Sequence, residues 1–268
     1  MIRLSLARLR RSALRATTAG RTAAPLFALT AAAALVLPAP VEAQDLPDAN
    51  TLIASYVEAI GGADRFQGLS SVTRGTLAIP AAGIEGQFEL VQRYPDQMRM
   101  NVELPGLGEI LSGFTGEVGW SVNPMMGAQL MEGPELAQMR EQSSIPASLR
   151  DPSVVPGRET VEQVEFEGEA CWRVRLTWAS GRESFDCYSV ETGLLVASEA
   201  VQVTAMGDVP SVSIYRDYRD FEGRTTPTRM IQRVAGQEQV MVIESVEYGE
   251  VDASRVAPPA QIQALIGG

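Results

Sequence analysis

Residues 84–123 read IEGQFELVQRYPDQMRMNVELPGLGEILSGFTGEVGWSVN, and this stretch decides the fold. Apolar and polar residues alternate along 84–90 and again along 98–104. A period of two places the apolar set on one face of a β-strand. The turn signals Tyr94-Pro95-Asp96 and Pro105-Gly106 separate the runs closely, so neighbouring strands run antiparallel. The stretch therefore predicts a β-meander with one apolar face.

The rest of the chain continues the sheet. Alternating runs recur between residues 159 and 248, where turns such as Ser180-Gly181 and Thr192-Gly193 divide them. The whole pattern predicts a mostly β chain of the α+β class, with a single curved antiparallel sheet of about 10–11 strands. No linker or repeat divides the chain, so one large domain is expected.

Two helical segments interrupt the strand pattern. Residues 46–62 carry apolar side chains at helical spacing, where Asp48 or Asn50 can cap the helix and Gly61-Gly62 ends it. A second helix is predicted at 135–142, inside a methionine-rich insertion that we expect to lie across one mouth of the sheet. The apolar stripe of the first helix can cover the open sheet face, and whether this helix completes the core or moves as a lid is left open.

The first 43 residues have the pattern of a targeting segment. Six arginines and no acidic residue precede residue 22, and the apolar run 23–37 is too short to span a bilayer comfortably. Val41-Glu42-Ala43 offers small residues at the cleavage positions, which predicts a secretory signal peptide cut after Ala43. The pair Arg10-Arg11 leaves twin-arginine export open beside the general route.

The exported chain is predicted to be strongly acidic. Its domain covers residues 44–257, and a short, loosely packed tail follows at 258–268. Removing the six arginines and one glutamate of the signal from the chain's 22 basic and 33 acidic residues leaves a net charge of −16. Such a charge disfavours nucleic acid and anionic membrane surfaces as partners.

The chain contains no histidine and no lysine. A Ser-His-Asp triad and a histidine-ligated zinc are therefore excluded, as are the Schiff-base and P-loop chemistries that need lysine. An enzyme could still use paired carboxylates with tyrosine, but the acidic residues alternate along strands as solvated faces do. The sequence predicts no enzyme, no cofactor and no metal site.

The two cysteines, Cys171 and Cys187, suit an exported protein with one disulfide. A hairpin centred on Ser180-Gly181 places Cys171 opposite Val190, so direct pairing requires a slipped turn or a bulge. We still expect the disulfide, because two free thiols are unusual in an oxidising compartment.

Several short motifs recur in one known fold family. They are Ala59-Ile60-Gly61-Gly62, Leu104-Pro105-Gly106-Leu107-Gly108, Gly116 to Trp120 with Ser121, Glu191-Thr192-Gly193-Leu194-Leu195, Asp217-Tyr218-Arg219 with Glu222-Gly223 and Pro227, and Asp252-Ala253-Ser254-Arg255-Val256. In these motifs the chain resembles the LolA/LolB-like superfamily, in particular its branch of outer-membrane lipoprotein-sorting proteins. The resemblance covers nearly the whole exported chain, although Val256 stands where such proteins often carry an aromatic residue. The motifs are structural punctuation, so no functional residue is carried over.

The resemblance implies an unclosed half-barrel whose concave face, covered by the N-terminal helix and the mid-chain helical insertion, accepts acyl chains. It therefore implies a periplasmic, monomeric binding or carrier protein for lipid or lipoprotein acyl chains in envelope biogenesis, with envelope proteins as further partners. The alternative is a non-catalytic partner-binding or assembly module on the same scaffold. An acyl chain of about fifteen carbons needs on the order of 12 kcal/mol to enter water bare, so carriage requires an enclosing apolar surface.

The apolar residues of the predicted strands are the candidate ligand lining. Methionines supply pliable lining for such a cavity, although Met98, Met100, Met230 and Met241 could equally be ordinary core. The predicted lining residues are Phe88, Leu90, Met98, Met100, Val102, Ile110, Trp120, Trp172 and Val174.

Overall fold

The computed structural model describes residues 46–204 and 207–267. The predicted signal peptide and its cleavage site lie outside these described residues. The helices are α1 (Ala49–Ala59), α2 (Gly133–Ser143), α3 (Ile145–Ser148) and α4 (Ala260–Ile266), with 3-10 turns η1 (Ala63–Phe66), η2 (Pro80–Ala82) and η3 (Ala253–Val256). Of the helices described, none has the length and apolar character needed to cross a membrane.

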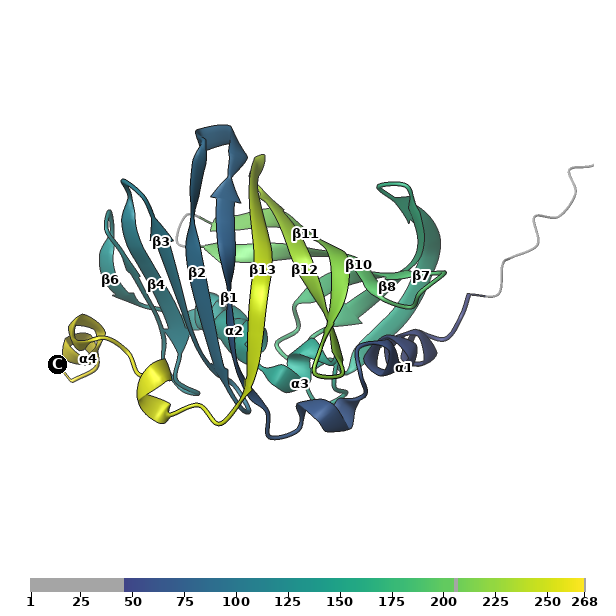
Figure 1. Ribbon diagram of the computed structural model, residues 1–268. Helices are drawn as coiled ribbons and strands as arrows, with labels where there is room; N and C mark the ends of the chain where they lie inside the picture. The colour runs from purple at the N-terminus through teal and green to yellow at the C-terminus, as the bar shows by residue number, and fades with distance from the viewer. Residues whose placement is uncertain (1–45, 205–206, 268) are drawn as a thin grey trace, which may run out of the picture. The chain divides into compact units, whose positions relative to one another are not determined.

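The strands form one antiparallel sheet (Figure 1). In chain order they are β1 (Ser70–Ile79), β2 (Ile84–Arg93), β3 (Gln97–Leu104), β4 (Gly108–Phe114), β5 (Gly119–Asn123), β6 (Gly127–Leu130), β7 (Gly157–Phe166), β8 (Glu169–Thr177), β9 (Glu183–Ser189), β10 (Leu195–Thr204), β11 (Gly207–Phe221), β12 (Arg224–Val234) and β13 (Gln237–Gly249). The mostly β, single-sheet prediction is confirmed, with 13 strands in the described part of the chain in place of the ten or eleven expected.

The strand order is β6-β5-β4-β3-β2-β1-β13-β12-β11-β10-β9-β8-β7. Two meanders, β1–β6 and β7–β13, are thus joined by pairing of the first strand with the last. The consecutive strands β6 and β7 end at opposite edges, so the sheet does not close into a barrel. The connection that carries α2 and α3 must therefore cross from one edge to the other.

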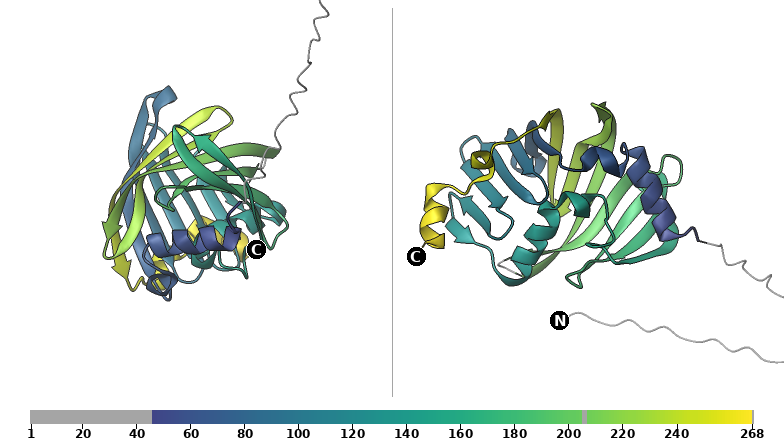
Figure 2. Two further views of the ribbon diagram at one scale, coloured as in Figure 1. Left: turned by 90° about the vertical axis from the view of Figure 1, so that its right-hand side faces the viewer. Right: turned by 90° about the horizontal axis from the view of Figure 1, so that it is seen from below.

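The sheet has an inner and an outer face, which the strand register defines. Residues directly opposed on antiparallel strands share a face. Phe88 opposes Val102 on what we call the inner face, and Arg74 opposes Glu89 on the outer face. Helix α2 contacts β4 and β5 near one edge and β10 near the other. Because these strands are far apart in the sheet order, the sheet curves around the helix, as Figure 2 shows.

Helix α1 packs as part of the core. Asp48 caps it by accepting a hydrogen bond from the Thr51 backbone N–H at 3.0 Å. Its residues Ala49 and Ile53 join a buried cluster with β8 and β9, and Gly61, which follows its C-cap, has a φ of 119°. A Cβ at Gly61 would lie 2.4 Å from a backbone oxygen, so only glycine fits this close approach.

The C-terminal segment corrects one expectation. The tail after residue 257 was predicted to pack loosely, but it forms α4 and buries Ile262 completely against Trp120 and Leu111 on the outer face. Nearby, η3 adds Val256 to a cluster with two valines of β1 and β2. The tail therefore completes an apolar cluster on the outer face. The segment is too short to show a hydrophobic periodicity from which this packing could be predicted.

Candidate functional site

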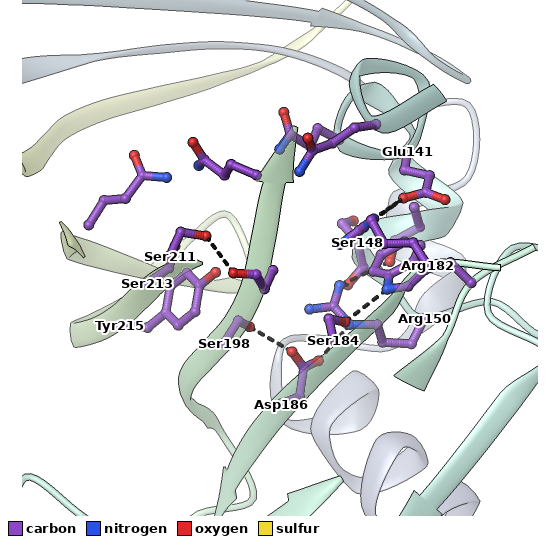
Figure 3. Close-up of a pocket in the computed structure, with 17 residues that line it drawn as sticks. Glu141, Ser148, Arg150, Arg182, Ser184, Asp186, Ser198, Ser211, Ser213 and Tyr215 are labelled. Carbon is purple, nitrogen blue, oxygen red and sulfur yellow. Dashed lines mark hydrogen bonds and ion pairs between the residues drawn. The ribbon is translucent and has the colours of Figure 1, made fainter. Parts of the chain in front are cut away.

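A cavity of about 260 Å³ lies on the inner face, between the α2–α3 connection and strands β9–β12 (Figure 3). Its lining is polar, with serines and glutamines, two arginines, two acids and Tyr215. This differs from the apolar cavity that the sequence predicted. We call it the polar cavity.

Alternation along β10 and β11 builds the floor of the polar cavity. Ser198 of β10 opposes Ser213 of β11, and Ala200 opposes Ser211. These four short side chains point to the inner face, where larger residues would fill the space. Tyr215, two residues along, closes one side of the floor.

A buried ion pair joins the α3 end of the connection to the sheet. The carboxylate of Asp186, which is 1% exposed, accepts hydrogen bonds from Arg150 Nε at 2.7 Å, Ser198 Oγ at 2.6 Å and Tyr188 Oη at 2.9 Å. Arg150 Nη1 also donates to the carbonyl of Ala147 at 3.0 Å. Burial by itself lowers the pKa of Arg150, but the facing Asp186 outweighs it and raises that pKa well above its usual value. Arg150 therefore stays charged and paired.

A second ion pair holds α2 over the turn between β8 and β9. Arg182 donates to Glu141 Oε2 through Nε at 2.9 Å and Nη2 at 2.6 Å. Its guanidinium also lies 4.7 Å from the centre of the Trp178 ring, and Trp178 Nε1 donates to Ser184 Oγ at 2.8 Å. The pair is nearly buried, so it fixes the wall of the cavity.

Helix α2 also completes the edge of β10 beyond the end of β9. The Gln138 amide accepts from the Val203 backbone N–H at 2.8 Å and donates to the Val201 carbonyl at 3.3 Å. This side chain thus takes the place of a neighbouring strand. It fixes the distance between α2 and the sheet, and with it the width of the cavity.

The charges in the polar cavity cancel, because two arginines pair with two acids. What remains is neutral: Gln202 and Gln232 line the cavity, and their amides make no hydrogen bond with another part of the described chain. Burial raises the pKa of the Tyr215 phenol, which therefore stays protonated at neutral pH. Within residues 46–204 and 207–267, no group of three His, Cys, Asp or Glu side chains is placed to hold a metal ion.

The other half of the inner face is apolar. Five buried residues of β1, β2, β3 and β13, Phe88 among them, form its centre, and eight half-buried hydrophobic residues pack against them. All members of this cluster come from strands. We call it the apolar zone; its members are Leu77, Phe88, Val102, Leu104, Ile243, Ile79, Ile84, Leu90, Met100, Ile110, Phe221, Met241 and Val246.

The structure brings together most of the predicted lining. Phe88, Leu90, Met100, Val102 and Ile110 belong to the apolar zone. A sixth residue, Met98 of β3, opposes Phe114 on the same inner face.

Three predicted lining residues lie elsewhere. Val174 and Trp172 face inward on β8, but Val174 is completely buried in the cluster that α1 covers. Trp120 lies on the outer face, because its partner Gly113 opposes Arg99 there. Its ring packs against Ile262 of α4. The phase of alternation cannot be carried across turns of unknown register, which is why Trp120 was assigned to the wrong face.

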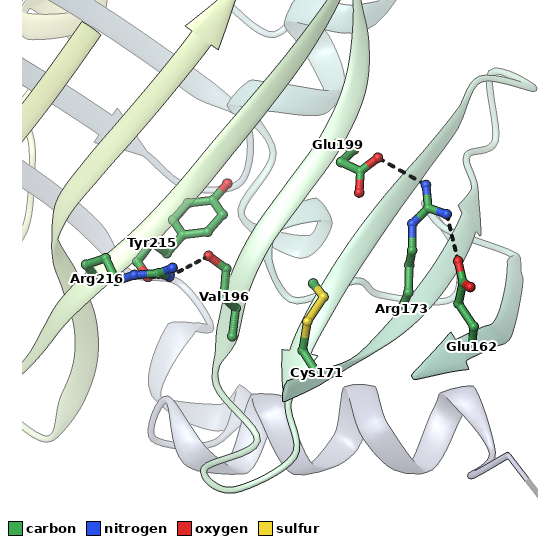
Figure 4. The surroundings of a disulfide bond; sticks show 8 residues. Glu162, Cys171, Arg173, Val196, Glu199, Tyr215 and Arg216 are labelled. Atoms are coloured by element: carbon green, nitrogen blue, oxygen red, sulfur yellow. Dashed lines mark hydrogen bonds and ion pairs between the residues drawn. A yellow bond between two sulfur atoms is a disulfide. The ribbon is translucent and has the colours of Figure 1, made fainter. Parts of the chain in front are cut away.

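The predicted disulfide is present between Cys171 and Cys187, with Cα atoms 5.5 Å apart (Figure 4). Cys171 opposes Ser189 rather than Val190, so the register is slipped by one residue from the simplest hairpin. The two cysteines are then diagonal neighbours on the outer face, next to the ion pairs of Arg173. Direct pairing of the cysteines was expected to require either a slipped turn or a bulge, and the structure has the slipped turn.

Sequence reasoning missed the polar cavity. Its signal was present, since Ser198, Ala200 and Gln202 alternate along one strand, and Ser211, Ser213 and Tyr215 along the next. Polar alternation of this kind is normally assigned to the solvated face. Only the pairing register, and a helix from a distant part of the chain, reveal that it faces inward.

The open, curved antiparallel sheet, with a helix on its concave side and an apolar zone whose cluster contains no helical residue, forms an unclosed half-barrel. The chain has the fold of a LolA superfamily protein from Nitrosomonas europaea, with a TM-score of 0.54 and 13% identity over 79% of this chain and 98% of that one. A DUF1329 family protein from Desulfovibrio piger is similar at a TM-score of 0.53 and 13% identity, over 78% and 97% of the two chains. No protein-family model matches the sequence, and no curated protein matches it. At this identity the likeness shows the fold alone.

Proposed function

We propose that this protein binds lipid or lipoprotein acyl chains on the apolar zone and carries them through the periplasm as a non-catalytic carrier. The apolar zone carries the proposal: eight of its hydrophobic side chains are only half-buried, and each of its members lies on a strand. Elsewhere on the inner face, Ala49 and Ile53 of α1 and Ala147 of α3 fill the space over β8 and β9. The apolar zone has no such helical cover in its cluster, so its exposed area is free to bury a ligand.

The chemistry of the apolar zone fits an acyl chain. Each methylene that leaves water contributes about 0.8 kcal/mol, so several half-buried side chains in one patch can hold a long chain. Met100 and Met241 are unbranched and adapt to a flexible ligand. The fold shared with a LolA superfamily protein supports this proposal, and the predicted signal at residues 1–43 supports the periplasm as its location.

The proposal is tested by displacement of a fluorescent fatty acid from the purified protein. Met100→Asp places a charge in the apolar zone and should abolish binding. Met126→Asp makes the same change at a turn residue that is 61% exposed, and should leave binding intact. Thermal melts of both variants separate loss of the site from loss of the fold. If the wild-type protein binds no acyl probe at micromolar concentration, the proposal is wrong.

A partner-binding role is the second candidate, and one observation favours it. Met125 is 90% exposed and Met126 is 61% exposed, at the turn between β5 and β6. The turn between β3 and β4, which presents Leu107 at 46% exposure, lies beside it, because a Cβ at Gly108 would be 3.2 Å from Pro124 Cγ. If Met125→Ser with Met126→Ser removes a cross-linked envelope partner while acyl binding is absent in the wild type, this second candidate is favoured.

A further inference from the structure

The polar cavity and the apolar zone are continuous on the inner face. One cross-strand row runs from Tyr215 of the cavity to Met230, then to Met241, and then to Leu77. The last two residues belong to the apolar zone. The next row sets Gln232 of the cavity against Gln239. Strand β12 is therefore the border, and a single elongated molecule can contact both regions.

The chemistry of the cavity selects an uncharged group. Arg150 and Arg182 are each engaged by a carboxylate, so neither offers an unbalanced positive charge to a phosphate or carboxylate. The two acids are likewise engaged, which leaves no site for an amine. The free groups include the amides of Gln142, Gln202 and Gln232, which both donate and accept. Hydroxyls and amides of a ligand match these groups best.

The volume of the cavity limits the size of that group. At about 260 Å³ the cavity is smaller than the sites of roughly 300 Å³ and above that hold drug-sized ligands. A single sugar ring or a short amide-bearing group is of suitable size.

We propose that the polar cavity binds the neutral, hydroxyl- or amide-rich head of an amphiphile whose acyl chain lies on the apolar zone. This inference rests on the proposed function, and it adds the class of ligand: a neutral polar head rather than an anionic one. The occupant then contacts the glutamines through its head and Met241 through its chain.

Three probes with the same twelve-carbon chain test the head: dodecyl glucoside, dodecyl phosphate and lauric acid, each titrated below its micelle concentration. The wild-type protein should bind the glucoside at least about tenfold more tightly than either anion, since two or more neutral hydrogen bonds are gained. Gln232→Leu should remove most of this preference and leave lauric acid binding unchanged. Gln87→Leu makes the same change at an exposed position of the outer face, and should change neither.

A second variant should gain relative affinity for one probe, a result that a misfolded protein would not give. Gln232→Arg introduces a cation without a carboxylate partner in the cavity, and should shift the preference toward dodecyl phosphate. If the glucoside binds no better than lauric acid, or if Gln232→Leu weakens all three probes alike, the inference is overturned while the proposed function stands. If none of the probes binds, the proposed function fails and the inference fails with it.

Discussion

The buried pair of Arg150 and Asp186 gives the sharpest stability prediction. Asp186→Asn keeps the shape of the side chain but leaves the Arg150 guanidinium, whose side chain is 12% exposed, without its counter-charge. Removing one partner of a buried pair costs about 3–5 kcal/mol. Three hydrogen bonds converge on this carboxylate, so the loss is not relieved by a local rotation.

Urea unfolding followed by circular dichroism measures this loss. With a slope of about 2.5 kcal/mol per molar for a domain of this size, the midpoint should fall by between about 1 and 2 M. Glu247→Gln is the control: it removes a carboxylate that pairs with Arg74 at 2.6 Å but is 64% exposed. An exposed pair contributes about 0–1 kcal/mol, so its midpoint should hardly move.

A double-mutant cycle distinguishes the pair from the packing around it. Arg150→Met removes the charge that Asp186→Asn would leave unpaired, so the double variant should be more stable than the sum of the single losses predicts, by about 1–3 kcal/mol. If the losses in free energy of unfolding are additive in the double variant, the prediction is wrong. It is also wrong if the urea midpoint of Asp186→Asn equals that of the Glu247→Gln control. The pair would then be a feature of the cavity wall with no role in stability.

Other parts of the fold can be tested in the same way. Reduction of Cys171–Cys187, 16 residues apart, should lower the free energy of unfolding by about 3 kcal/mol, and equal midpoints with and without reductant would contradict this. Ile262→Ala should cost about 2–5 kcal/mol because this side chain is fully buried, whereas Leu265→Ala, at a position 47% exposed, should stay within about 0.5 kcal/mol; equal melts would show that α4 does not pack. Burial raises the pKa of Tyr56 from 10.0 to about 12, so its stabilising contribution is complete below pH 10 and is lost as the pH rises toward 12. Tyr56→Phe should therefore flatten alkaline unfolding in this range, and an unchanged profile would argue against a buried phenol.

The sheet was predictable because its signal is local. Period-two alternation identifies a strand within a few residues, and the intervening turns then impose antiparallel order. The exception is β6, whose four residues, Gly127–Leu130, are too few to show alternation. Helix α1 was predictable for the same local reason, since its Asp48 cap and its apolar stripe both lie within one segment.

The candidate site was predictable only in part, because it depends on register and on distant contacts. Six of nine predicted lining residues share the inner face on three neighbouring strands, where the alternation and the tight turns keep one phase. Trp120 departs from that phase after the turn at 115–118, and it lies on the outer face against Ile262 from the far end of the chain. The polar cavity needs both Asp186 and Glu141, which are 45 residues apart in sequence, and no local pattern joins them.

The topology itself explains why the inner face has two regions. Strands β6 and β7 follow one another in sequence but occupy opposite edges, so the segment between them has to cross the concave side. That crossing places α2 and α3 over β9–β12, and it brings Glu141 and Arg150 to the cavity wall. Helix α1 then fills the space over β8 and β9, and α4 packs on the outer face. The apolar zone on β1–β4, β11 and β13 is the part of the inner face whose cluster draws no residue from these helices, and it lies next to polar groups that the crossing segment has positioned.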